Sequence, residues 1–157
     1  MKYGFIDFAA VLLTALVMGV FWGTWFTLTR SLSGFSPDEF IHIGKTIIAN
    51  VAMPMRLLMP VTLLVLLLAV WLNRKSGKIP SSFYGLAFLL MAVTLVITVG
   101  VEVPIDNQIK TWSGNNLPSN WKELRTTWDK FHTLRTFTSL AALCVLTAGI
   151  LQKKNTR

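Results

Sequence analysis

The stretch FYGLAFLLMAVTLVITVGVEV, residues 83–103, holds one acidic residue, Glu102, and no basic residue. A helix needs about 20 mostly apolar residues to cross the hydrocarbon core of a bilayer, so this stretch is long enough to span a membrane. Three other stretches are similarly apolar, at residues 6–28, 51–72 and 134–151. The sequence therefore predicts an all-α integral membrane protein, a four-helix bundle with one span from each stretch.

The composition is that of a membrane protein. Of 157 residues, 53% are hydrophobic and 14% are charged, against roughly 25% charged in soluble domains. Mean hydropathy is +0.56. Four spans and their connections use almost the whole chain, so residues 1–157 are expected to form a single domain. The formal net charge of +8 is explained by orientation in the membrane and by anionic lipid headgroups, and no nucleic-acid partner is expected.

Basic residues in short loops predict the orientation of the spans, because Lys and Arg concentrate on the cytoplasmic side. In a four-span arrangement one side carries Lys2, Arg74, Lys75, Lys78, Lys153, Lys154 and Arg157. The last connection on the opposite side, residues 104–133, also carries basic residues, but acidic ones offset much of their charge. We therefore expect a multi-pass protein of the cell membrane with both termini in the cytoplasm.

Two of the helices are predicted to begin outside the membrane. Ser36 is a capping residue, Pro37 follows at the first helical position, and Glu39 lies three residues after the cap. Asn120 and Glu123 repeat this pattern more weakly. The second and fourth helices are therefore expected to extend beyond the outer membrane surface.

The first span contains a pair of small residues, Gly19 and Gly23, at a spacing of four. Small residues at this spacing allow two membrane helices to approach closely. We therefore expect this face of the first helix to pack tightly against a neighbour.

A stripe of aromatic and ionisable residues marks the fourth helix. At offsets i, i+4, i+7, i+11 and i+14 stand Trp121, Arg125, Trp128, His132 and Arg135. On one helix they fall within an arc of about 80°, because side chains three and four apart share a face. Such a stripe suits neither a solvated face nor an apolar core, and it indicates one wall of a polar site.

Charged residues near the outer ends of the spans need partners, because ionisable groups at membrane depth are costly. They are Arg56, Glu102, Asp106 and Arg135. One interpretation pairs them inside the bundle; the other extends the arginines to the headgroups and leaves the carboxylates solvated. The tryptophans also have two interpretations, a pocket lining or an interfacial aromatic belt. The tryptophans concerned are Trp112, Trp121 and Trp128.

These residues carry a resemblance to the anthrone oxygenase-like family of small four-span membrane proteins. Its C-terminal signature is similar to Val103-Pro104-Ile105-Asp106-Asn107, followed by Trp112, Trp121, Arg125, Trp128, His132 and Arg135. Its weaker N-terminal signature is similar to Asn50 and Pro54. One departure is Asp106, because Asn is frequent at this position in the family, and the carboxylate changes the charge of the site.

The resemblance implies an activity. Family members with an assigned activity convert anthrones to anthraquinones with molecular oxygen, and they are thought to need neither flavin nor metal. The implied partners are therefore an apolar aromatic small molecule and O₂, in a protein surrounded by membrane lipid. No cofactor is expected.

The resemblance also implies roles for individual residues. His132 would be the base, and Arg125 and Arg135 would be the cations that stabilise the enolate. The implied substrate-binding residues are Trp112, Trp121, Trp128, Asp106, Asn107 and Asn50.

A non-enzymatic function is the alternative. The same tryptophans and arginines suit a protein that binds a lipid, a quinone or a protein partner, since stacking and cation–π contacts need no proton transfer. Cys144 is the only cysteine, so neither a disulfide nor a thiol redox pair is expected. A haem or metal would need the only two histidines, His42 and His132, and no metal site is expected. The sequence leaves an oxygenase and a binding protein as the two candidates, and leaves the oligomeric state open.

Overall fold

The computed structural model describes residues 4–75 and 78–155. In chain order the elements are α1 (Gly4–Thr27), the 3₁₀ helix η1 (Thr29–Gly34), α2 (Pro37–Asn73), α3 (Lys78–Ile97), the π-helix η2 (Thr98–Glu102), α4 (Val103–Ile109) and α5 (Trp121–Asn155). The segments α3, η2 and α4 follow one another without a break, so the chain forms four long helices, each long and apolar enough to cross a membrane. This confirms the all-α prediction. Lys2 and Arg157, used to predict orientation, lie outside the described residues.

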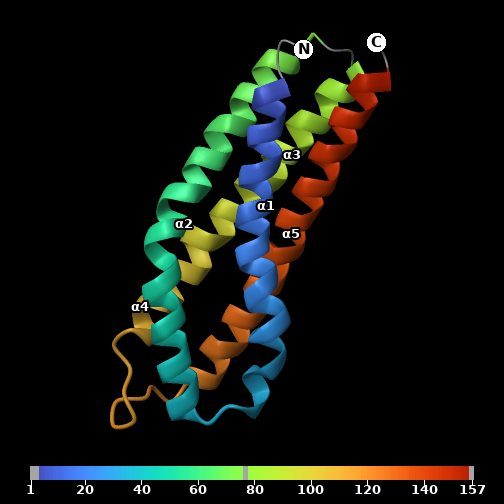
Figure 1. The fold of residues 1–157 in the computed structure, drawn as a ribbon. Helices are drawn as coiled ribbons and strands as arrows, with labels where there is room; N and C mark the ends of the chain where they lie inside the picture. The colour runs from blue at the N-terminus through green and yellow to red at the C-terminus, as the bar shows by residue number, and fades with distance from the viewer. Residues whose placement is uncertain (1–3, 76–77, 156–157) are drawn as a thin grey trace.

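The four long helices pack side by side in one bundle (Figure 1). α5 packs against α3 and α1, and α2 packs against the same two helices. The end of α2 and the start of α3 lie at the same end of the bundle as the start of α1 and the end of α5, whereas η1, the start of α2 and the loop before α5 lie at the opposite end. Below, these are called the terminal end and the loop end.

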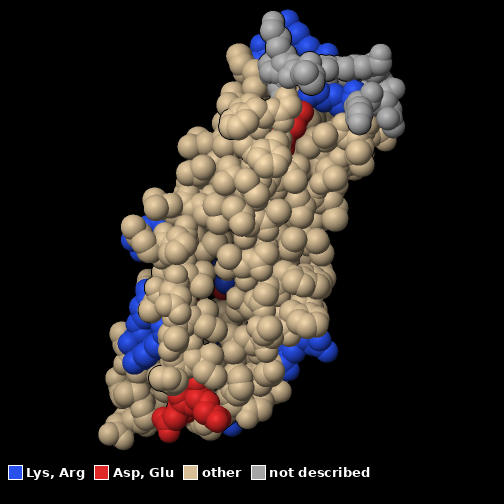
Figure 2. Space-filling view, in the orientation of Figure 1, with Lys and Arg blue, Asp and Glu red and all other residues tan. Residues whose placement is uncertain are grey.

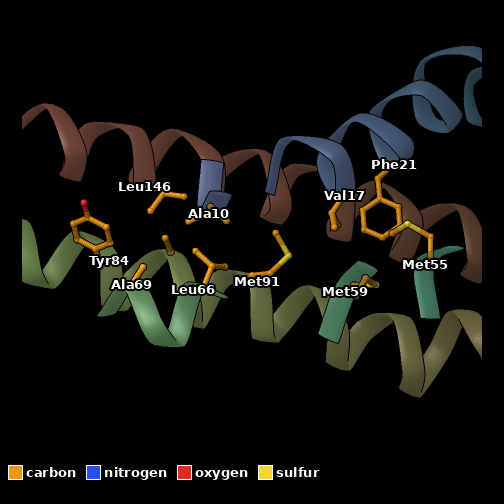
Figure 3. Close-up of a cluster of buried hydrophobic side chains, with 12 residues drawn as sticks. Ala10, Val17, Phe21, Met55, Met59, Leu66, Ala69, Tyr84, Met91 and Leu146 are labelled. Atoms are coloured by element: carbon orange, nitrogen blue, oxygen red, sulfur yellow. The ribbon is translucent and has the colours of Figure 1, made fainter. Parts of the chain in front are cut away.

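The core follows the helical period of the sequence. On α1 the buried residues recur at spacings of three and four, at Ala10, Thr14, Val17 and Phe21. Figure 3 shows this face of α1 meeting buried side chains of α2, α3 and α5, among them Leu66, Met91 and Leu146. The outer faces carry exposed apolar side chains such as Phe5, Phe8, Leu12 and Leu16. An apolar exterior of this extent suits surroundings of lipid rather than water.

A polar network ties all four helices together at the terminal end. Asp7 of α1 accepts a hydrogen bond from the Tyr84 hydroxyl of α3 at 2.9 Å and one from the Asn73 amide of α2 at 3.3 Å. The other carboxylate oxygen of Asp7 forms an ion pair with Lys153 of α5 at 2.7 Å. Asp7 and Lys153 are both buried. We refer to these four residues as the Asp7 network.

The start of α2 at the loop end confirms the predicted cap at Ser36. The Ser36 hydroxyl accepts a hydrogen bond from the Glu39 N–H, and the Glu39 carboxylate accepts one from the Ser36 N–H at 2.8 Å. This reciprocal pair satisfies two donors at the start of α2. α5 begins at Trp121, directly after Asn120.

Close helix contact occurs at a glycine other than the predicted pair. A Cβ built at Gly19 or Gly23 meets nothing within 4 Å, and both glycines are exposed. The prediction of tight packing there is therefore wrong within the described chain. At Gly149 of α5, by contrast, a Cβ would lie 2.7 Å from the Cβ of Phe83 on α3. Spacing alone did not reveal which glycine faces a neighbour.

Gly149→Ala is therefore expected to destabilise the protein by about 1–3 kcal/mol, because the two helices must separate to admit the methyl group. Thermal unfolding in detergent, followed by circular dichroism, measures this change. Gly23→Ala is the matched control and is expected to be neutral or slightly stabilising. Equal unfolding temperatures for the two variants would show that the contact at Gly149 relaxes freely.

Candidate functional site

The helices enclose a cavity of about 460 Å³ beside α4, in the half of the bundle toward the loop end. Apolar side chains such as Phe21, Met55 and Leu95 form much of its wall. Its polar lining consists of Thr24, Arg56, Thr98, Asp106, Asn107, Lys110, His132 and Arg135. Figure 2 shows a hollow in the apolar surface between α1 and α2, with basic and acidic atoms at its bottom. The volume lies in the range of about 300–1,000 Å³ that is usual for small-molecule sites.

A buried ion pair joins two of the helices behind this cavity. The Nη2 of Arg135 lies 2.8 Å from Oε2 of Glu102, whose side chain is 0% exposed. The same guanidinium donates through Nη1 to the Thr98 hydroxyl at 3.4 Å. This confirms the interpretation that pairs charges inside the bundle, for Arg135 and Glu102. Arg56 belongs to no ion pair among the described residues.

The two partners of Arg135 lie on a widened turn of helix. In η2 the Val103 N–H donates to the Thr98 carbonyl, five residues back instead of four. Pro104 explains the change, because it has no N–H to donate to the Gly100 carbonyl and so interrupts the regular pattern. Single π turns inside α-helices are frequent at functional sites.

His132 has both ring nitrogens engaged. Its Nε2 lies 3.2 Å from the Phe21 carbonyl oxygen, which only accepts, so we assign the ring hydrogen to Nε2. Its Nδ1 then accepts from Nε and Nη2 of Arg135, at 3.2 and 2.8 Å. This arrangement defines a neutral imidazole whose one basic nitrogen faces a guanidinium.

Trp128 forms a flat wall beside His132. The two rings are stacked, with centroids 4.8 Å apart and planes within 3° of parallel. The Trp128 indole N–H donates to the Asp106 carboxylate at 3.1 Å, so Asp106 is held at the edge of the same cavity. Trp112 and Trp128 are only 4% and 8% exposed, so the interpretation as an aromatic belt is wrong for these two residues.

The stripe on α5 does not face a single site. Arg125 points away from the large cavity and donates to the Leu32 carbonyl of η1 at 3.0 Å, with its guanidinium 5.0 Å from the Trp121 ring. It lines a separate polar cavity of about 170 Å³, together with Thr29 and Asp129. The first turns of α5 thus face η1, whereas the turns from Trp128 to Arg135 face the large cavity.

The remaining predicted residues are divided in the same way. Asn107 lines the large cavity. Trp112 and Trp121 pack on Phe40 at the loop end, with ring centroids 6.4 and 6.2 Å from it, and line neither cavity. Their apolar cluster adjoins the large cavity through Trp128. Asn50 is exposed on α2 and lines neither cavity. The large cavity therefore brings together five of the nine predicted residues: Asp106, Asn107, Trp128, His132 and Arg135.

Several lining residues were not predicted. Phe21 supplies the carbonyl that orients His132, and its ring lies 4.5 Å from the Arg135 guanidinium carbon. Met55 and Met59 form part of the apolar wall on α2. Thr98 had one signal in the sequence, because it lies four residues before Glu102 and so on a similar face of the helix. The other unpredicted lining residues come from elements distant in sequence and had no such signal.

The two histidines do not share a site. His42 is exposed on α2 and lines neither cavity. Within residues 4–75 and 78–155, no group of three or more His, Cys, Asp or Glu side chains is placed to hold a metal ion.

Four long apolar helices around a mainly apolar cavity with a polar group of side chains define a small four-span helical membrane protein. The sequence profile of the anthrone oxygenase family matches residues 46–145, which is more than half of the chain. The chain therefore belongs to the anthrone oxygenase family. The matched range contains every polar lining residue of the large cavity except Thr24. No curated protein and no solved structure matches the chain.

Proposed function

We propose that this protein is a membrane-embedded oxygenase that oxidises anthrone-type or other polycyclic phenolic substrates with O₂, without a flavin or a metal. The observation that carries the proposal is the neutral His132 beside the Arg135 guanidinium, in a cavity walled by Trp128 and apolar side chains. In the proposed topology the terminal end of the bundle is cytoplasmic, and α2 and α5 extend beyond the outer membrane surface. The chain acts as a single domain.

The reaction requires three things of the protein: a base, a cation that stabilises the enolate, and a cavity that excludes bulk water. The methylene carbon of an anthrone is acidic because its anion is a delocalised aromatic enolate. A base removes that proton, and the electron-rich enolate reduces O₂ and then bonds to it at the same carbon. Protonation gives a hydroperoxide, and loss of water from it gives the quinone, so one anthrone and one O₂ yield one anthraquinone and one water. A site that excludes bulk water strengthens each charge interaction in this sequence.

His132 and Arg135 have different roles in the first step, the removal of the methylene proton. His132 takes the proton on Nδ1, while its Nε2–H stays on the Phe21 carbonyl. Arg135 must first leave Nδ1, and a substrate oxygen that carries developing negative charge gives its guanidinium a new acceptor. Asp106 and Trp128 fix the ring plane of His132, as their hydrogen bond and stacking suggest. Arg125 acts at a distance, as a positioning residue that holds α5 against η1.

His132→Ala is expected to lower the rate of anthrone oxidation roughly 10²- to 10⁴-fold, the usual contribution of a general base. The measurement is substrate-dependent oxygen uptake with quinone formation, using purified protein in detergent and 1,8-dihydroxyanthrone. His42→Ala is the matched control, because it removes an exposed imidazole that lines neither cavity. A folded His132→Ala variant with the wild-type rate would refute the assignment.

A non-enzymatic binding protein is the second candidate, and one observation favours it. Both nitrogens of His132 are hydrogen-bonded to groups of the protein itself, so a free base appears only if Arg135 moves. A quinone or lipid that co-purifies tightly, with no oxygen uptake above the spontaneous rate, would support binding without catalysis. The same cavity would then hold the aromatic group by stacking on Trp128 and by the Arg135 cation.

A further inference from the structure

The mouth of the large cavity can be located from the exposure of its lining residues. The exposed lining residues come from α2, η2, α4 and the residue directly after α4: Ala52, Arg56, Pro60, Val99, Val103, Asn107 and Lys110. The lining residues from α1 and α5, by contrast, are buried or half-buried. The cavity thus opens on the side of the bundle, between α2 and the η2–α4 segment, in addition to the hollow between α1 and α2 (Figure 2).

This side of the bundle faces the same surroundings as its apolar exterior. Val99 and Val103 at the mouth are 58% and 41% exposed, and Met53 and Leu57 beside Arg56 are each 59% exposed. Exposed apolar side chains of this density are stable in lipid, so a ligand reaches the mouth through the membrane.

The depth of the mouth follows from α1. Phe21 and Thr24 line the cavity, while Trp22 and Trp25 of the same turns pack together with ring centroids 5.2 Å apart. Tryptophans gather where acyl chains meet headgroups. The cavity therefore lies at the boundary of the hydrocarbon, where an amphiphilic molecule places its polar group outward and its rings inward.

Two cations stand at the mouth. Arg56 is exposed and has no carboxylate partner among the described residues, and Lys110 donates from Nζ to the Asn107 side chain at 2.9 Å. At the boundary Arg56 can extend its guanidinium toward the headgroups, and an anionic group on a ligand at the mouth would give it a charged partner there. Arg135, at the far side of the cavity, already has Glu102.

We propose that Arg56 and Lys110 form an anion-recognising rim, and that the ligand is a polycyclic phenol bearing a carboxylate, which enters sideways from the membrane. Its acid group binds at the rim, and its flat rings lie in the cavity that Met55 and Trp128 line. This proposal rests on the proposed function for the nature of the rings, but it concerns binding and requires no turnover.

The test uses stable ligands, so that catalysis does not enter. Binding of anthraquinone-2-carboxylate and of neutral anthraquinone is measured by quenching of tryptophan fluorescence, with protein in nanodiscs of zwitterionic lipid. The wild type is expected to prefer the carboxylate by about 10- to 100-fold, the value of a hydrogen bond to a charged group. Arg56→Gln is expected to abolish most of this preference while neutral anthraquinone binds as before, and Arg56→Lys is expected to retain part of it.

Arg74→Gln is the matched control, since Arg74 is exposed at the opposite end of α2, where its guanidinium stacks 4.5 Å from Trp71. Equal affinities of the wild type for the two ligands would overturn the proposal. So would an Arg56→Gln variant that keeps the preference but loses a co-purifying anionic phospholipid, because the rim would then be a lipid-phosphate site. If the preference holds but no anthrone is oxidised, the rim is supported and the oxygenase proposal alone fails.

Discussion

Glu102→Leu is expected to destabilise the protein by about 3–5 kcal/mol, because it leaves the Arg135 guanidinium buried without its carboxylate. Arg135 is 8% exposed and Glu102 is fully buried, so both groups are largely shielded from bulk water. His132 would also lose order, since its Nδ1 accepts from the same guanidinium. Unfolding in mixtures of mild detergent and SDS, followed by circular dichroism, measures the free-energy change.

A double variant separates the structural role of this pair from its chemical role. Replacing a buried ion pair by apolar side chains of similar volume is often neutral, so Glu102→Leu with Arg135→Met is expected to recover most of the lost stability. The same double variant is expected to show no anthrone oxidation, because the cation beside His132 is gone. Glu123→Leu is the control, since it removes an exposed carboxylate from α5. A double variant no more stable than Glu102→Leu alone would show that the two charges are not coupled.

The sequence predicts the fold because its main signals are local. The length and apolar character of each span depend on consecutive residues, and the capping box of Ser36 and Glu39 needs only four. The Glu102–Arg135 pair could also be predicted from the sequence, because two opposite charges near the same end of neighbouring spans have few other ways to be neutralised. Helical phase placed Trp128, His132 and Arg135 on one face, and the cavity confirms that they lie together.

The sequence could not show that the stripe on α5 faces two different cavities. The helical period gives the direction in which a side chain points, but not which element packs against it. Arg125 shares its face with His132, yet it meets the Leu32 carbonyl of η1, a segment that had no helix signal in the sequence. The Phe21 carbonyl is likewise a backbone group 111 residues away from His132. Such contacts depend on how α1 and α5 are placed along each other, and a single sequence does not give this relative placement.

Asp7 shows the same limit at the terminal end. In the sequence it is an acidic residue at the start of the apolar stretch 6–28, and nothing near it in the chain points to its partners. In the structure it is buried and accepts hydrogen bonds from Tyr84 and Asn73. The four residues of the network are up to 146 positions apart, so no periodicity reveals them.

Asp7→Ala is expected to destabilise the protein by about 3 kcal/mol, because one change removes the ion-pair partner of Lys153 and the acceptor of two hydrogen bonds. The network contains one residue from each long helix, so its loss loosens the whole terminal end. Unfolding in SDS-containing detergent measures the loss. Hydrogen exchange is expected to rise first in the terminal turns of α1 and α5.

The loss of stability in Tyr84→Phe, compared with that in Asp7→Ala, shows how much a single contact of the Asp7 network contributes. Tyr84→Phe removes only one donor to a charged group and is expected to lose about 1.5–3 kcal/mol, while the Lys153 pair remains. Asp38→Ala is the control, since it removes an exposed carboxylate at the loop end. If Asp7→Ala were no more destabilising than Asp38→Ala, the ion pair would contribute nothing.

The cavity lies toward the other end of the bundle, so anthrone binding to the folded fraction of Asp7→Ala is expected to be unchanged. The Asp7 network therefore stabilises the bundle, whereas the Glu102–Arg135 pair stabilises it and, in the proposed function, also positions the cation beside His132.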